Sequence, residues 1–250
     1  MKNMRKLLAI VLCLLLVTTS FATVSAEESE FSGIVSKNVE VSENGDVKVL
    51  IDIAGNPGIT AIKLWVSYDP AVLTVKENGI KDTGLLVGKI QNTFIEGRFP
   101  LSWQDSGATA ANNYKNGTIA EIDFKMKEDF VGTTDVTVTV DFAENFVNGR
   151  FGDAPAMQSG VISLTRKLVI ADGVVNANAV NGEALIIASY DGDVMLDCKI
   201  YPNLTENMQI QIADVINTNG ATKVKAFLWE DLETLVPVFD CAEEIITSHQ

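Results

Sequence analysis

Histidine is almost absent from this sequence of 250 residues, and its single histidine, His249, stands next to the C-terminal residue. Chain ends are usually mobile, so a Ser/His/Asp or Cys/His triad cannot be assembled around that side chain. Zinc sites built on histidine are excluded for the same reason. We expect His249 to be an ordinary surface residue.

Cysteine is also scarce. Cys13 lies in an apolar N-terminal run, which leaves Cys198 and Cys241 for the folded protein. Two interpretations stay open for this pair. A disulfide would close a loop worth about 4 kcal/mol in the chain-entropy model, and the alternative is two buried free thiols. No base lies near either cysteine in the sequence, so neither indicates catalysis.

Basic residues are few: 19 Lys and Arg stand against 33 Asp and Glu, a formal net charge of −14. Three of the basic residues fall within the first 26 positions, where there is no acid, so the rest of the chain is more acidic still. Such a surface repels phosphate backbones and anionic lipid headgroups. We therefore expect no nucleic-acid partner and no charge-driven membrane binding.

The only long apolar run covers residues 7–17, which is too short to span a bilayer. Basic residues precede it, and Val-Ser-Ala at 24–26 offers small residues for cleavage. Residues 1–26 are therefore predicted to be a signal peptide, with a mature protein that starts at Glu27 and is secreted, extracellular and free of the membrane. The sequence shows no terminal apolar tail, no Leu-Pro-x-Thr-Gly sorting signal and no second copy of its first half.

Tight-turn signals are abundant throughout the chain. They separate alternating, β-branched runs such as residues 47–53, 122–126 and 136–140. No convincing helical window appears, so the pattern predicts antiparallel β-sandwiches. The signals are Asn-Gly at Asn44, Asn78, Asn116, Asn148, Asn181 and Asn219, and Asp-Gly at Asp172 and Asp191.

Residues 61–68 form the clearest strand. Every second residue from Ile62 to Tyr68 is apolar, and Asp69-Pro70 ends the strand because proline cannot donate to a ladder. Trp65 is out of phase with the apolar set. A large aromatic on that face is either covered by another element, such as a loop at residues 77–98, or available to a ligand. Leu50 is out of phase on its own strand, so we expect it to share an apolar patch with Trp65.

An ordered set of segments around this strand resembles a cohesin module, the domain of cellulosomes that grips dockerins. The set comprises Asn-Pro-Gly-Ile at 56–59, the Tyr-Asp-Pro corner at 68–70, Trp-Gln-Asp-Ser at 103–106, and residues 116–125 and 159–164. The resemblance runs from about residue 39 to residue 164. It implies a nine-stranded antiparallel jelly-roll sandwich without catalytic activity. It also implies a dockerin-bearing partner recruited for extracellular polysaccharide degradation, with the calcium carried by the dockerin.

The resemblance also places the site and shows where this sequence departs from it. In familiar cohesins an asparagine and an aspartate on the strand before the Tyr-Asp-Pro corner grip the partner, and here those positions hold Ala61 and Lys63. The module therefore takes either a different class of dockerin or another ligand. The expected partner-binding residues are Lys63, Trp65, Ser67, Ala61 and Leu50.

A boundary is predicted near Arg166-Lys167, where one set of strands ends and a fresh set begins. Residues 168–240 resemble a small immunoglobulin-like β-sandwich that closes secreted clostridial proteins, which implies a Gram-positive source. Only a spacer or accessory role follows for this second region.

Two other function classes stay open. A carbohydrate-binding module would need aromatic faces aligned on one surface, although Trp103 is in phase with its apolar neighbours and is expected in the core. A purely structural or adhesive surface protein is the other. The candidate aromatics in the first region are Trp65, Trp103, Tyr114, Phe94 and Phe99.

Acidic residues give weaker signals. A glycosidase needs two carboxylates in a cleft, but Glu77, Asp82 and Glu96 lie in a stretch with the composition of a solvated loop, so no enzyme activity is expected. No EF-hand pattern is present, and a structural calcium on this chain is left open. Its candidate ligands are Asp105, Asp123, Asp141, Glu144 and Asp153.

Overall fold

The computed structural model describes residues 31–88, 90–105, 110–179 and 182–246. The expected signal peptide, the expected mature start at Glu27 and His249 all lie outside these residues. The described chain is almost entirely β-structure, with one helix of four residues, α2 (Ile212–Val215). The all-β prediction is therefore confirmed.

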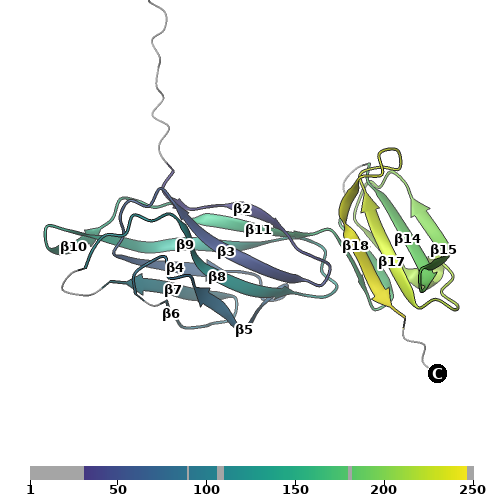
Figure 1. The fold of residues 1–250 in the computed structure, drawn as a ribbon, viewed down its shortest axis with the longest axis horizontal. Coiled ribbons are helices and arrows are strands. Elements are labelled where there is room, and N and C mark those ends of the chain that lie inside the picture. The colour runs from purple at the N-terminus through teal and green to yellow at the C-terminus, as the bar shows by residue number, and fades with distance from the viewer. Residues whose placement is uncertain (1–30, 89, 106–109, 180–181, 247–250) are drawn as a thin grey trace, which may run out of the picture. The chain divides into compact units, whose positions relative to one another are not determined.

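The first region contains two sheets (Figure 1). One has four strands in the order β1-β3-β8-β5, and the other has seven, in the order β2-β11-β9-β4-β7-β6 with β10 paired to β9. The strand bounds are β1 (Gly33–Ile34), β2 (Lys37–Glu40), β3 (Asp46–Ala54), β4 (Ala61–Ser67), β5 (Leu73–Asp82), β6 (Gln91–Asn92), β7 (Arg98–Gln104), β8 (Gly117–Met126), β9 (Gly132–Val147), β10 (Arg150–Asp153) and β11 (Gly160–Arg166).

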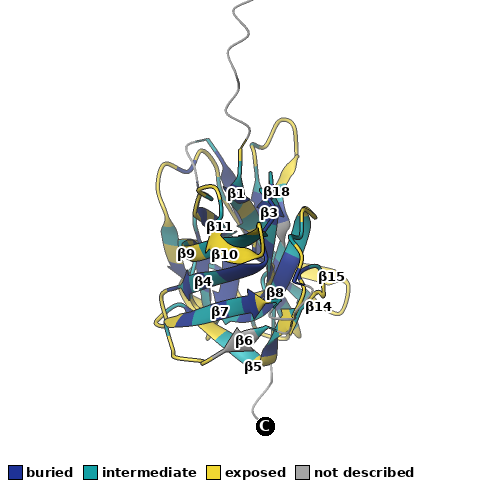
Figure 2. Cartoon of the chain, turned by 90° about the vertical axis from the view of Figure 1, so that its left-hand side faces the viewer, coloured by how far each residue is buried: buried dark blue, intermediate teal, exposed yellow. Residues whose placement is uncertain are grey.

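Alternation along the strands builds the core between these two sheets. Val49 and Ile51 on β3 face Leu64 and Val66 on β4 within one cluster of buried side chains that reaches from residue 34 to residue 164. Strand residues two apart lie on one face of a sheet, so the residues between them point outward. In Figure 2 the β4 strand is buried or intermediate, whereas the β10 strand is exposed.

The second region also contains two sheets, with strand orders β12-β13-β16 and β15-β14-β17-β18. Its buried apolar residues form a separate cluster from residue 168 to residue 242. The immunoglobulin-like interpretation and the independence of the two regions remain predictions. The bounds are β12 (Leu168–Ala171), β13 (Val174–Ala177), β14 (Ala184–Asp191), β15 (Val194–Tyr201), β16 (Met208–Gln211), β17 (Lys223–Trp229) and β18 (Pro237–Ile245).

Some details differ from the sequence predictions. Asn78-Gly79 does not close a hairpin: Asn78 has a φ of 53°, and the β5–β8 register shifts between Val75 and Ile80, so the pair forms a bulge inside β5. The stretch expected to be one loop, residues 77–98, therefore begins as strand. One strand pair, β2 with β11, is parallel and not antiparallel. The described residues of the first region form eleven strands, which include the short β6 and β10.

Arg166 is the largest departure from the pattern of charged residues at the surface. It is fully buried at the end of β11, and its guanidinium donates to the carbonyl oxygens of Phe130, Lys127, Glu128 and Glu43. Burial lowers its pKa. A buried charge is stable only when hydrogen bonds replace its lost hydration. These four bonds therefore tie the segments at residues 43 and 127–130 to the end of β11.

Cys198 and Cys241 are free thiols. Cys198 lies on β15 and Cys241 on β18, and β14 and β17 stand between those strands in the sheet. Three inter-strand spacings separate the two backbones by roughly 14 Å. A disulfide needs Cα atoms within about 7 Å, so the structure supports the free-thiol alternative and rules out the intrachain disulfide.

Candidate partner-binding face

The outer face of the seven-stranded sheet carries three of the expected site residues. Lys63, Trp65 and Ser67 alternate with buried Leu64 and Val66 along β4 and are each partly exposed. Their register neighbours on β7 and β9 share this face, because directly opposite residues of paired strands point to the same side. Those neighbours are Ser102, Pro100, Arg98, Phe142, Thr139 and Thr137.

Trp65 is held between two cations. Arg98 lies 4.5 Å and Lys63 Nζ 4.8 Å from the centre of its ring, both within the range of cation–π attraction. The indole is thus flanked by Lys63 and by Arg98, the last residue of the stretch at 77–98 that was expected to cover it, and it stays partly exposed. Its orientation is fixed while part of its surface remains open to solvent.

Asp141 completes this cluster. Its Oδ2 lies 2.8 Å from Lys63 Nζ, and it is the extra residue of a bulge in β9, where the register with β4 shifts between Lys63 and Leu64. Lys63 holds the pKa of this carboxyl below its usual value, with smaller contributions from Trp65 and Arg98. The sequence analysis named Asp141 only as a calcium candidate and did not name Arg98. Both residues are brought to Trp65 by the pairing of β4 with β9 and β7, which the sequence does not record.

Of the two other expected site residues, Ala61 lies on this face but is buried, and Leu50 lies on the other sheet. Ala61 starts β4 but is only 4% exposed, because its short side chain lies between its register neighbours Gln104 and Glu144. Leu50 points outward from β3, which belongs to the other sheet. Two outer faces of a sandwich point in opposite directions, so the predicted apolar patch shared by Leu50 and Trp65 is wrong.

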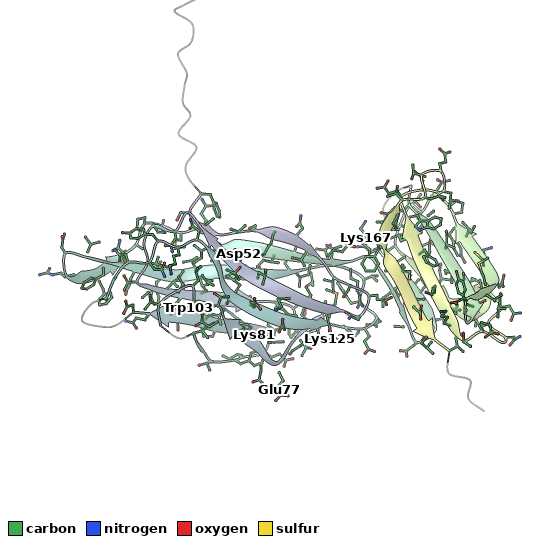
Figure 3. All side chains as sticks on the ribbon, viewed as in Figure 1. Asp52, Glu77, Lys81, Trp103, Lys125 and Lys167 are labelled. Atoms are coloured by element: carbon green, nitrogen blue, oxygen red, sulfur yellow. The ribbon has the colours of Figure 1, made fainter. Side chains whose placement is uncertain are left out.

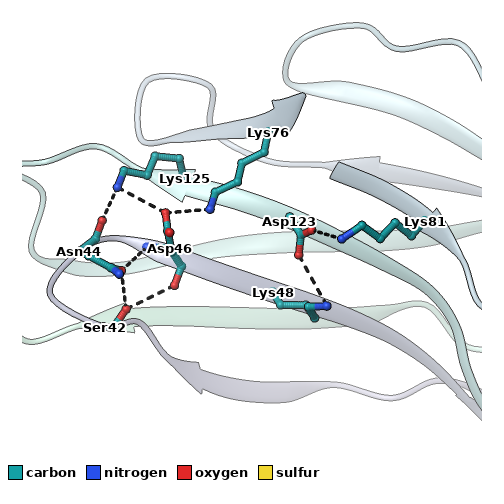
Figure 4. A network of polar contacts seen from close by, with 8 residues as sticks. All are labelled: Ser42, Asn44, Asp46, Lys48, Lys76, Lys81, Asp123 and Lys125. Atoms are coloured by element: carbon teal, nitrogen blue, oxygen red, sulfur yellow. Dashed lines mark hydrogen bonds and ion pairs between the residues drawn. The ribbon is translucent and has the colours of Figure 1, made fainter. Parts of the chain in front are cut away.

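The outer face of the β1-β3-β8-β5 sheet carries several ion pairs (Figure 4). Asp46 pairs with Lys76 and Lys125, and Asp123 pairs with Lys81 and Lys48. These lysines lower the pKa of both carboxyls. Exposed pairs contribute little to stability, but they leave this face charged and internally matched. Lys81, Lys125 and Asp52 mark the same sheet in Figure 3.

The five aromatics considered for sugar binding do not form one platform. Phe99 and Trp103 are buried, which confirms Trp103 as a core residue (Figure 3). Tyr114 is exposed but lies over Gly58, and Phe94 lies beside Phe99, with 5.5 Å between their ring centres. Only Trp65 is on the open face of the seven-stranded sheet.

A different set of aromatics, which sequence reasoning missed, extends that face. Phe142 lies opposite Lys63, and two positions further on β9 come Glu144 and then Phe146. Phe151 on β10 lies opposite Phe146, with ring centres 5.0 Å apart. These residues were hidden because the alternating run at 136–140 predicts a short strand, whereas β9 continues to Val147 and turns back at Asn148-Gly149 with positive φ at both positions.

The acidic candidates are dispersed. Asp123 and Asp141 are engaged by lysines, and Asp82 accepts the backbone N–H groups of Gly84 and Ile90 in a turn. Within the described residues no three acidic, histidine or cysteine side chains gather as metal ligands would. The described part of the chain likewise contains no helix long and apolar enough to cross a membrane.

No family model matches this sequence, and no curated protein matches it. The solved structures that resemble it include several cohesins. The seventh ScaB type I cohesin of Pseudobacteroides cellulosolvens is 20% identical, with a TM-score of 0.45 over 54% of this chain and 92% of that one. An OlpA cohesin–dockerin complex from Clostridium thermocellum gives 13% identity and a TM-score of 0.44 over 54% and 99%. A non-cellulosomal cohesin from Archaeoglobus fulgidus gives 14% and 0.40 over 54% and 91%.

Proposed function

We propose that the first region is a non-catalytic, cohesin-like module of a secreted protein, and that it binds a dockerin-bearing protein through the outer face of its seven-stranded sheet. The observation that carries the proposal is the partly exposed indole of Trp65, flanked by Lys63 and Arg98 at the middle of that face. The ordered sequence segments that resemble cohesins name the class of partner.

The contrast between the two outer faces supports this choice of surface. The ion pairs of the four-stranded sheet satisfy their charges among themselves, so a partner would have to disrupt them to bind there. The opposite face offers the aromatic Trp65, with the charged group of Lys63, Arg98 and Asp141 on one part of its surroundings and neutral Ser102, Pro100, Thr137 and Thr139 on the rest, which can be desolvated at smaller cost. Interface energy usually concentrates on such an aromatic, with polar neighbours that exclude water.

The partner is expected to differ from those of familiar cohesins. Those proteins carry an acid on this strand, whereas this chain carries Lys63 and supplies the acid, Asp141, from the neighbouring strand. The exchange alters the charge pattern that a partner must match, which sets specificity more than affinity.

The test is calorimetric titration of the mature protein with dockerins from the secretome of the same organism, with soluble glucan in a parallel series. Trp65→Ala should cost about 2 kcal/mol or more, a factor of roughly thirty in affinity. Lys63→Asp should weaken the natural partner while the fold is retained. Chelation of calcium should abolish binding by unfolding the dockerin, with no change in the melting of this protein.

Tyr114→Ala is the matched control, because Tyr114 is an exposed aromatic that lies against Gly58 and outside β4, β7 and β9, and it should bind like the wild type. Unchanged dockerin affinity in Trp65→Ala would place the site elsewhere. Glucan binding that disappears in Trp65→Ala would instead establish the carbohydrate-binding alternative.

A further inference from the structure

β15 is an edge strand of the second region that keeps unusual apolar exposure. It pairs only with β14 in the sheet order β15-β14-β17-β18. Val194, Met195, Leu196 and Ile200 are 65%, 56%, 45% and 47% exposed. Open edges carry unpaired backbone groups, and proteins normally protect them with charges, prolines or a covering element. An apolar edge of this kind is therefore a candidate for pairing with another strand.

The order of residues in β15 identifies that strand. Asp197 and Lys199 stand on either side of Cys198, with Leu196 and Ile200 one step further out. When two copies of this strand run antiparallel about Cys198, each Asp197 lies opposite a Lys199, and each Ile200 lies beside the bulged Leu196 of the other copy. Opposite charges directly across two strands are stabilising. The strand is thus complementary to itself under a two-fold axis.

We propose that β15 is a homodimerisation edge. Two copies of this chain join their β15-β14-β17-β18 sheets along it by antiparallel pairing centred on Cys198. The contact is isologous, so it closes at two copies and leaves no further open edge on that side. Cys198 would then face its own counterpart across the axis, with Cβ atoms about 5 Å apart.

The charged side chains of β15 are compatible with this pairing. The carboxylate of Asp197 accepts the N–H of Cys198 at Oδ1 and the N–H of Asn217 at Oδ2. A carboxylate has about four acceptor positions, so each oxygen keeps one for the lysine of the second copy. Lys199 is exposed and lies over the ring of Tyr201 at 5.8 Å, which leaves its charge available at the edge.

The length of the contact is limited by a bulge. The β14–β15 register passes from Ser189 opposite Asp197 to Tyr190 opposite Met195, so Leu196 is the extra residue of a bulge and the regular part of the edge covers residues 197–201. A pairing this short falls below the size of a standard stable interface, and the dimer is expected to be weak, with a dissociation constant on the order of micromolar. Dimerisation would link two partner-binding modules and raise their avidity, a consequence that rests on the proposed function. The proposal of a dimer does not rest on the proposed function.

Sedimentation velocity of the full mature chain over about 1–200 µM should show a monomer–dimer equilibrium in this range. Lys199→Asp places like charges opposite each other twice per dimer and should weaken it about tenfold or more. Asp197→Lys should do the same, and an equimolar mixture of the two variants should recover a heterodimer, because each strand then carries a single sign. Lys115→Asp, the same change at an exposed residue outside β15, is the control and should leave the dimer unchanged.

A short bis-maleimide supplies the second readout. With Cys241→Ser the chain should cross-link to a dimer through Cys198, whereas Cys198→Ser with Cys241 retained should not. The reaction is run at about pH 8, because burial and the neighbouring Asp197 raise the pKa of the Cys198 thiol. A protein that stays monomeric over the whole concentration range would overturn the proposal. A dimer that cross-links only through Cys241 would also overturn it, as would a dimer whose dissociation constant is unchanged by both charge reversals.

Discussion

At the scale of single residues, the candidate site depends on an ion pair between two strands. Lys63 on β4 meets Asp141 from the bulge in β9. The pair is exposed, so it adds little to stability. Its effect is to fix the lysine beside the indole of Trp65, which a lone flexible lysine would not do.

The pKa of Asp141 offers a direct check of this arrangement. Lys63 is the main cause of its lowered value, so Lys63→Ala should return the pKa toward the usual 3.9 or so. A carboxyl whose pKa is lowered in the folded state stabilises the native state at pH values above its ordinary pKa. That contribution to stability is lost as the pH falls through the lowered pKa. Carboxyl NMR titration of both proteins measures the shift. Asp231, held low by the Thr234 backbone, should not move; an unchanged Asp141 would mean that Lys63 does not contact it in solution.

At the scale of elements, the first region depends on close approaches that only glycine permits. β1 belongs to one sheet and β2 to the other, so the chain crosses between layers there and runs beside the start of β11. A Cβ on Gly160 would lie 2.6 Å from the carbonyl oxygen of Ile34, too close for any side chain. Gly152 in β10 has open space at the same position.

This contrast predicts the result of two alanine substitutions. Gly160→Ala should lower the free energy of unfolding by about 2 kcal/mol, because backbone must move to make room. Gly152→Ala should change it by less than about 0.5 kcal/mol. Urea unfolding followed by tryptophan fluorescence measures both. Equal effects of the two substitutions would show that the β1–β11 approach is not as close as described.

At the scale of the whole molecule, the buried residues fall into two clusters that share no member. β11 ends at Arg166 and β12 begins at Leu168, so a single residue separates the two sets of strands. The boundary predicted near Arg166-Lys167 therefore falls on a connection of one residue, Lys167, and it stays a prediction. Arg166 belongs with the first region, because all four of its carbonyl partners lie there.

A fragment of residues 32–167 should therefore fold alone with one cooperative unfolding transition. In this fragment Arg166→Met should cost about 3 kcal/mol, because it leaves several buried carbonyl groups without a donor. Circular dichroism during urea unfolding gives both results. A fragment that lacks cooperative unfolding would show that the first region depends on the second.

The sequence alone determined the class of fold, the strand faces and the resemblance to cohesins. These follow from local rules: alternation decides which side of β4 is buried, and glycine after asparagine or aspartate permits turns such as those at Asn148 and Asp172. Trp65 could be identified in the same way, because its break with the apolar alternation can be seen within one strand. Local rules also have limits, since Asn-Gly can form a bulge, as at Asn78-Gly79, as well as a hairpin turn.

Only the tertiary structure decided which strands are neighbours. Leu50 and Trp65 both point outward, but their strands belong to opposite sheets, and no period in the sequence records that. Arg98 and Asp141 come to Trp65 from strands more than 30 positions away, and Cys198 and Cys241 lie apart on the two outer strands of one sheet. Alternation fixes the side to which a residue points, whereas the pairing order of the strands fixes what it meets, and that order is set by long-range packing of the two cores.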